Sequence, residues 1–183
     1  MSLGLSVLVR HMRRESIPSG QEAVRAQLLA DLGNLAYQCE QLDEAVGFYE
    51  LALRLLPSQK RALRDLGWTH WKREDWAACQ STWKRFASTF PELGEPHSLL
   101  ARLALQRMDY TNAVIEARLA VGKGTPLASS RLLLVNALLG AGEFREAGLE
   151  SDSLAADYPA NVRAQRMRGA VLTKRGDHVG ARD

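Results

Sequence analysis

The 183-residue sequence has little proline, few aromatic residues and no marked excess of either charge. It contains 6 prolines, and aromatic side chains make up only 7% of it. Its 24 lysines and arginines face 21 acidic residues, so the formal net charge is +3. A dedicated nucleic-acid binder would carry a dominant basic face, and this balance argues against nucleic acid as the partner.

Long apolar runs are also missing. The stretch from Leu132 to Leu139 is interrupted by Asn136, and it falls well short of the roughly 20 residues that a membrane-spanning helix needs. We therefore expect no direct insertion of this segment into a membrane. Hydrophobic residues at 46% and charged residues at 25% are ordinary for a soluble folded chain.

Cysteine is scarce as well. Cys39 and Cys79 stand alone inside helical patterns, without C-x-x-C spacing or a cysteine and histidine set for zinc. Two buried, reduced thiols are expected, because free cysteine packs as a small apolar group. Such thiols favour a reducing compartment without excluding an exported protein.

No catalytic or cofactor-binding pattern is visible. Gly122 to Thr125 resembles a phosphate loop, but Ala117 stands where the first glycine of that motif belongs, so a turn is predicted instead. No serine or acid is placed beside a base and an orienting carboxylate. The sequence predicts neither an enzyme nor a cofactor, and no metal-ligand spacing joins the four histidines, which are His11, His70, His97 and His178.

What the sequence does contain is an internal repeat. The pair Leu32-Gly33 returns 34 residues later as Leu66-Gly67, and Pro57 returns as Pro91 at the same spacing. Small residues also recur at repeat positions 8 and 20. The period predicts repeats at residues 26–59, 60–93, 94–127 and 128–161, and a partial repeat at 162–183.

Each repeat has the pattern of two helices. In the first repeat, Leu29, Leu32, Gly33 and Ala36 recur with helical spacing on one face. After a turn, Ala45, Tyr49, Ala52 and Leu56 form the apolar face of a second helix, which Pro57 helps to end. One such helix pair cannot bury its outer face alone and must stack on its neighbours.

The period, the Leu-Gly pair, the alanines and the closing proline together resemble the tetratricopeptide-repeat (TPR) family, from Ala26 to Asp183. The resemblance implies an all-α fold, an α-solenoid in which tandem antiparallel helix pairs form a right-handed superhelix. It also implies a scaffold that binds a partner protein or peptide in its concave groove. The sequence departs from the family at repeat position 4. The tryptophan that is usual there is replaced, in successive repeats, by Leu29, Leu63, His97, Arg131 and Gln165.

The two ends carry separate expectations. Residues 1–18 are predicted to be an N-terminal extension, either a short amphipathic helix or a disordered tail that includes expression-derived residues. Ser19 followed by Glu22 is a capping-box pattern that begins the array at 19–183. Asp183 interrupts the fifth repeat, so we expect a fragment of a larger assembly or scaffold protein whose apolar end frays or self-associates.

The groove candidates centre on the second repeat. Arg64, Trp68, Trp71 and Lys72 share a helix face that differs from the core-facing one, and Trp and Arg are enriched at binding hot spots. Apolar anchors among positive charges predict an acidic peptide partner with apolar side chains. The resemblance implies a groove lined at repeat positions 2, 5, 9, 12 and 13, which with flanking residues gives Asn34, Tyr37, Gln38, Arg61, Arg64, Trp68, Trp71, Lys72, Arg102 and Gln106.

Other interpretations remain open at this point. The tryptophans would equally suit packing between helices, with the basic side chains solvated. The chain would also suit a substrate-recruiting arm of a glycosyltransferase or of an envelope-polysaccharide synthesis or export protein. A helical-repeat RNA binder should carry a basic residue at one position of every repeat, but position 5 holds Ala30, Arg64, Ser98, Leu132 and Arg166.

Overall fold

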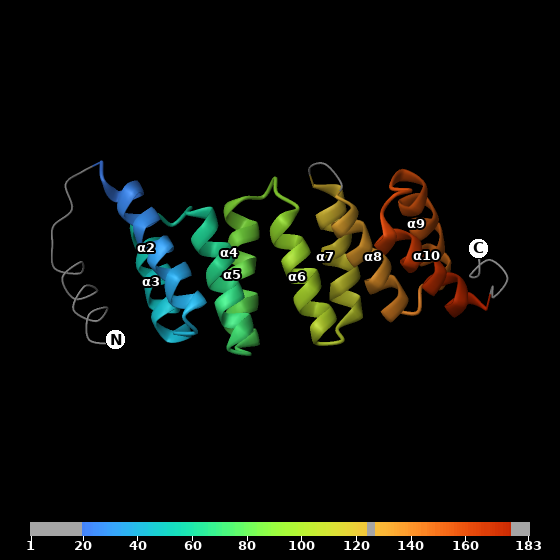
Figure 1. Ribbon diagram of the computed structural model, residues 1–183, viewed down its shortest axis with the longest axis horizontal. Coiled ribbons are helices and arrows are strands. Elements are labelled where there is room, and N and C mark those ends of the chain that lie inside the picture. Colours follow the sequence, from blue (N-terminus) through green and yellow to red (C-terminus); the bar gives the residue numbers. More distant parts are fainter. Residues whose placement is uncertain (1–19, 124–126, 177–183) are drawn as a thin grey trace. The chain divides into compact units, whose positions relative to one another are not determined.

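The computed structural model describes residues 20–123 and 127–176, and within these ranges all regular structure is α-helical (Figure 1). The predicted extension at 1–18 and the chain end at 177–183 lie outside the described residues. The helices are α2 (Glu22–Gln38), α3 (Leu42–Leu55), α4 (Lys60–Lys72), α5 (Trp76–Thr89), α6 (Glu95–Gln106), α7 (Tyr110–Gly122), α8 (Ala128–Gly140), α9 (Phe144–Asp157) and α10 (Val162–Arg175).

The 34-residue period appears in the helix starts and in the turns. The second helix of each pair begins at Leu42, Trp76, Tyr110 and Phe144, each 34 residues after the previous one. The turn before each of these helices holds one residue with left-handed backbone. The same conformation follows α10. The residues at this place in the five repeats are Glu40 (φ 62), Glu74 (φ 58), Met108 (φ 55), Gly142 (φ 78) and Gly176 (φ 84). Only the last two are glycine, the residue that adopts this conformation without strain.

The chain forms two compact units, an N-terminal unit that ends at Thr89 and a C-terminal unit that begins at Phe90. The N-terminal unit contains α2 to α5, and its core includes the buried side chains of Leu29, Phe48, Leu63, Trp83 and Phe86. The unit also holds both cysteines. Cys79 is buried as expected, but Cys39 is exposed at the C-terminal end of α2, so the prediction of two buried thiols is wrong for Cys39.

Close approach of the paired helices depends on small residues. A Cβ atom on Gly33 would lie 2.8 Å from Cε1 of Tyr49, which is tighter than real side-chain contacts. Ala45 and Ala113 are fully buried. A larger side chain at these positions would push the helices of a pair apart.

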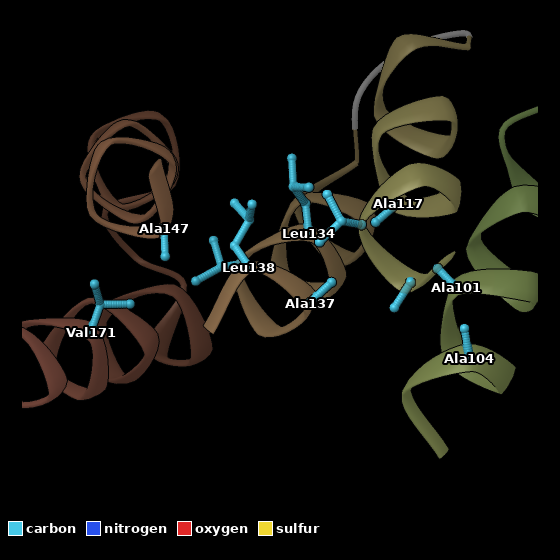
Figure 2. Packing of buried hydrophobic residues seen from close by; sticks show 11 residues of the cluster. Ala101, Ala104, Ala117, Leu134, Ala137, Leu138, Ala147 and Val171 are labelled. Carbon is cyan, nitrogen blue, oxygen red and sulfur yellow. The ribbon is translucent and has the colours of Figure 1, made fainter. Parts of the chain in front are cut away.

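The C-terminal unit contains α6 to α10 and has an alanine-rich core. Figure 2 shows Ala101 and Ala104 from α6, Ala117 from α7, Leu138 from α8 and Val171 from α10 within one cluster. Alanine at these points allows backbones to approach, while Leu134, Leu138 and Val171 fill the space between them. No helix within the described residues is long and apolar enough to cross a membrane.

Candidate functional site

A pocket of ≈ 280 Å³ opens between α2, α3 and α4 of the N-terminal unit. Helix α4 contributes four of its lining residues, because positions 61, 64, 65 and 68 fall on one face at helical spacing. Helix α2 contributes two and α3 one. The pocket is lined by Asn34, Tyr37, Tyr49, Arg61, Arg64, Asp65 and Trp68.

The two arginines of the pocket are already paired with carboxylates. Arg61 binds Asp31 on α2 at 2.6 Å (Nη1 to Oδ1) and lies 3.4 Å from Asp65 (Nε to Oδ2). Arg64 donates from Nε to Oδ1 of Asp65 at 2.8 Å. Two arginines and one aspartate leave the lining residues with a formal charge of +1, and Asp31 offsets it at the rim. The pocket is therefore closer to neutral than its arginines suggest.

Lys72 lies at the C-terminal end of α4 and is tied to α2. Its Nζ donates to Oε1 of Glu40 at 2.9 Å and stands 5.1 Å from the ring centroid of Tyr37. The hydrogen bond to Glu40 raises the pKa of the Lys72 ammonium above its usual value. Lys72 thus stays charged and holds the Tyr37 ring at the edge of the pocket.

Four tryptophans pack together beside the pocket. The ring centroids of Trp68 and Trp83 are 5.2 Å apart, those of Trp68 and Trp71 5.6 Å, and those of Trp71 and Trp76 5.5 Å. Trp83 is fully buried, and its Nε1 donates to the main-chain oxygen of Arg64 at 3.3 Å. Trp68 and Trp71 are half-buried. These two rings therefore both pack in the unit and present surface outward.

Tyr49 closes the back of the pocket. It is buried, and burial first, then the nearby Asp65 carboxylate, raise the pKa of its phenol. The phenol accordingly stays neutral. Its ring lies so close to Gly33 that a side chain at residue 33 would meet it.

The structure brings together most of the predicted groove residues in the N-terminal unit. Asn34, Tyr37, Arg61, Arg64 and Trp68 line the same pocket. Trp71 and Lys72 do not line the pocket but contact residues that do: Trp71 packs against Trp68, and Lys72 lies over the ring of Tyr37. The remaining predicted residues are elsewhere: Gln38 is exposed at the C-terminal end of α2, and Arg102 and Gln106 are exposed on α6, in the C-terminal unit.

Two lining residues, Asp65 and Tyr49, were not among the sequence candidates. Asp65 follows Arg64 directly and stands four residues after Arg61, a spacing that favours ion pairs on a helix. That signal was available in the sequence. Tyr49 was assigned to the apolar face of its helix, which is correct, but one edge of its ring also reaches the pocket.

The described residues offer no grouping of metal ligands. Across residues 20–123 and 127–176, no three histidine, cysteine, aspartate or glutamate side chains are grouped so that they could hold a metal ion. The pocket offers aromatic surface, amide and guanidinium donors and one carboxylate. This set is suited to non-covalent recognition of a peptide.

Several solved structures resemble this chain. The protein YrrB, described as a TPR protein with an unusual peptide-binding site, aligns over 99% of this chain and 88% of its own, with a TM-score of 0.69 and 16% identity. The protein MamA aligns over 88% and 87%, with a TM-score of 0.74 and 18% identity. A tetratricopeptide repeat protein from Parabacteroides merdae aligns over 97% and 66%, with a TM-score of 0.74 and 16% identity. No family model and no curated protein matches the sequence.

Proposed function

We propose that this chain, which has the tetratricopeptide-repeat fold, is a protein-interaction scaffold whose N-terminal unit binds a short peptide of a partner protein. The observation that carries the proposal is the pocket that Trp68 lines together with Arg61, Arg64 and Tyr37. A half-buried indole beside guanidinium groups is typical of binding hot spots. The peptide-binding site named for YrrB, a protein of similar fold, supports the same function here.

The proposed ligand is a peptide with one aromatic or aliphatic side chain next to an aspartate or glutamate. The apolar side chain would lie against Trp68 and Tyr37, where burial of its surface supplies affinity. The ligand carboxylate would replace Asp65 or Asp31 as the partner of an arginine. Acid recognition is then an exchange of ion pairs, so most of the affinity would come from the apolar anchor.

The proposal is one of binding without catalysis, in which the chain holds a partner within a larger assembly. It uses only residues of the N-terminal unit. Arg102 and Gln106, on α6, are not required for it.

The test begins with peptides selected from a random library on the purified protein, whose affinities are then measured by calorimetry. The proposal expects selected sequences that combine an apolar and an acidic residue. Trp68→Ala should weaken binding by about thirtyfold or more, as expected for loss of a hot spot worth about 2 kcal/mol or more. Trp68→Phe, which keeps an aromatic ring, should restore much of the affinity.

Lys84→Ala is the matched control, since Lys84 is an exposed cation on α5 that does not line the pocket. Melting temperatures of all variants separate lost binding from lost folding. Selected peptides that bind Trp68→Ala and the wild type equally well would exclude this pocket as the binding site.

A further inference from the structure

A second and larger pocket lies on the opposite side of α4. At about 100° per residue, positions 63, 66 and 70 point away from positions 61, 64 and 68. Leu63, Leu66 and His70 line this second pocket, which has a volume of ≈ 440 Å³ and lies among α3, α4 and α5. That volume is in the range of small-ligand sites. The proposed peptide function does not use it.

The floor of the second pocket is apolar. Leu53 of α3 and Leu63 and Leu66 of α4 are all buried, and each contributes to the lining. These three side chains form the apolar part of the lining, and a short branched aliphatic group would contact their few exposed atoms. The free energy gained from apolar burial there is small, because each side chain is already at least nine-tenths buried.

The rim of the same pocket is charged and polar. Arg54 on α3 and Arg85 on α5 both line it, together with a single carboxylate, that of Glu50. Arg85 is held near α3 by a hydrogen bond from its Nη2 to the main-chain oxygen of Pro57 at 3.4 Å. The two arginines outnumber Glu50, so the rim favours an anionic group.

The wall between floor and rim carries neutral polar groups. Ser81 and Thr82 supply hydroxyls from α5. His70 is buried, and its Nδ1 makes no hydrogen bond to any described residue. Burial lowers the pKa of this imidazole, so the ring is neutral near pH 7 and adds no charge of its own. A buried polar atom without a partner is uncommon in folded proteins and is often found where a ligand or water binds.

We propose that this second pocket binds a carboxylate attached to a short branched aliphatic group. The carboxylate would lie between Arg54 and Arg85 at the rim, and the aliphatic part on Leu53, Leu63 and Leu66. Two sources share this chemistry: a free branched-chain carboxylic acid, and the C-terminal leucine of a peptide. The site goes beyond the proposed groove and operates independently of it, because it uses the opposite face of α4.

The experiment is a titration of the ¹⁵N-labelled chain with 4-methylpentanoate, followed by amide chemical shifts. We expect saturable shifts at His70, Ser81 and Thr82. The uncharged 4-methylpentanamide should bind at least about tenfold more weakly, because a hydrogen bond to a carboxylate is stronger than one to a neutral amide. The double variant Arg54→Ala/Arg85→Ala should lose affinity to a similar extent, and Lys84→Ala should leave it unchanged.

In the second arm of the experiment, the labelled chain is titrated with a peptide that ends in leucine with a free carboxylate. Tighter binding of the peptide would identify a protein C-terminus as the source, and tighter binding of the small acid would identify a metabolite. Equal affinity for acid and amide would overturn the proposal. So would the absence of saturable shifts, an unaffected double variant, or shifts centred on Trp68. The double variant retains the groove residues, so binding of the library-selected peptides to it shows whether the first site is intact.

Discussion

The indole of Trp83 occupies the space that a side chain on residue 67 would need. Gly67 on α4 faces Trp83 on α5, and a Cβ atom at Gly67 would overlap the indole at Nε1. Trp83 is fully buried and donates a hydrogen bond to the oxygen of Arg64, so it has little freedom to move. We therefore expect Gly67→Ala to lower the free energy of unfolding by about 1–3 kcal/mol through overpacking.

Gly47 on α3 is the matched control for Gly67, because a Cβ atom there would meet nothing within 4 Å. Gly47→Ala should stabilise the unit by about 0.5–1 kcal/mol, since alanine loses less backbone entropy in a helix. Chemical denaturation of both variants gives the comparison. Equal effects of the two substitutions would show that Trp83 does not restrict residue 67.

The Asp65 carboxylate is expected to compete with an acidic ligand. It pairs with Arg64 at 2.8 Å and lies 3.4 Å from Arg61. Asp65→Asn should raise the affinity for acidic selected peptides by about twofold to fivefold, the range of a partly exposed ion pair. Asp43→Asn is the control, since Asp43 pairs with Arg73 at 3.0 Å and does not line the pocket. A loss of affinity in Asp65→Asn would mean that Asp65 positions the arginines for the ligand.

Charge at Arg64 should act mainly on the rate of association. Arg64 is half-exposed at the pocket, where a cation steers an acidic peptide over a distance of about 10 Å at 0.1 M salt. Arg64→Glu should slow association and reduce its salt dependence, with a smaller change in dissociation. Stopped-flow measurements in a salt series test this. An Arg64→Glu protein with the salt dependence of the wild type would indicate that the charge does not steer binding.

The left-handed turn residues give a fourth prediction. Gly142 has φ 78, and a Cβ atom there would meet nothing, so the cost of Gly142→Ala is purely conformational. We expect a loss of about 1 kcal/mol in unfolding free energy. Glu74, at the equivalent place in the second repeat, has φ 58, and Glu74→Gly should gain up to about 1 kcal/mol. Thermal unfolding of both variants tests the prediction. A loss of stability in Glu74→Gly as well as in Gly142→Ala would contradict it.

The two thiols should differ in reactivity. Burial raises the pKa of the Cys79 thiol to about 12, whereas Cys39 is exposed. Because the thiolate is the reactive form, a thiol reagent at pH 8 should modify one cysteine in the native protein. Cys39→Ser should abolish that rapid reaction, and Cys79→Ser should leave it intact. Rapid modification of the Cys39→Ser protein would show that Cys79 is accessible.

The sequence predicts the fold well because its signals are local and repeated. The spacing of Leu42, Trp76 and Tyr110 is enough to place the starts of three helices. Cys39 was misplaced because its helix ends at Gln38, and a periodic pattern does not fix the last residue of a helix.

Ion pairs between the two helices of a repeat were harder to predict, because each depends on two positions at once. Repeat position 4 holds His97 in the third repeat and Arg131 in the fourth, where the family usually has tryptophan. In the structure, His97 binds Glu116 at 2.7 Å and Arg131 binds Glu150 at 2.5 Å. Both glutamates stand at repeat position 23, so in each of these repeats the residue at position 4 has an acidic partner on the second helix. The sequence shows these residues but not that they meet.

The candidate site was predictable only in part for the same reason. Helical spacing placed Arg64 and Trp68 on one face, and the family resemblance added Arg61; all three line one pocket. The acidic partners of Arg61 and Lys72 stand about 30 residues earlier in the sequence: Asp31 lies on α2, and Glu40 lies in the turn that follows it. Which side chain meets which across two helices depends on their exact approach, and periodicity does not determine it.

The N-terminal unit ends at Thr89, and this boundary affects how the protein would emerge during synthesis. Both proposed pockets are built entirely from residues before that boundary. Ribosomes add about 5–20 residues per second, and units generally fold as they emerge, N-terminal first. The 94 residues from Phe90 to Asp183 thus take about 5–20 seconds to translate at that rate. The N-terminal unit would therefore have time to fold while the C-terminal unit is still being translated.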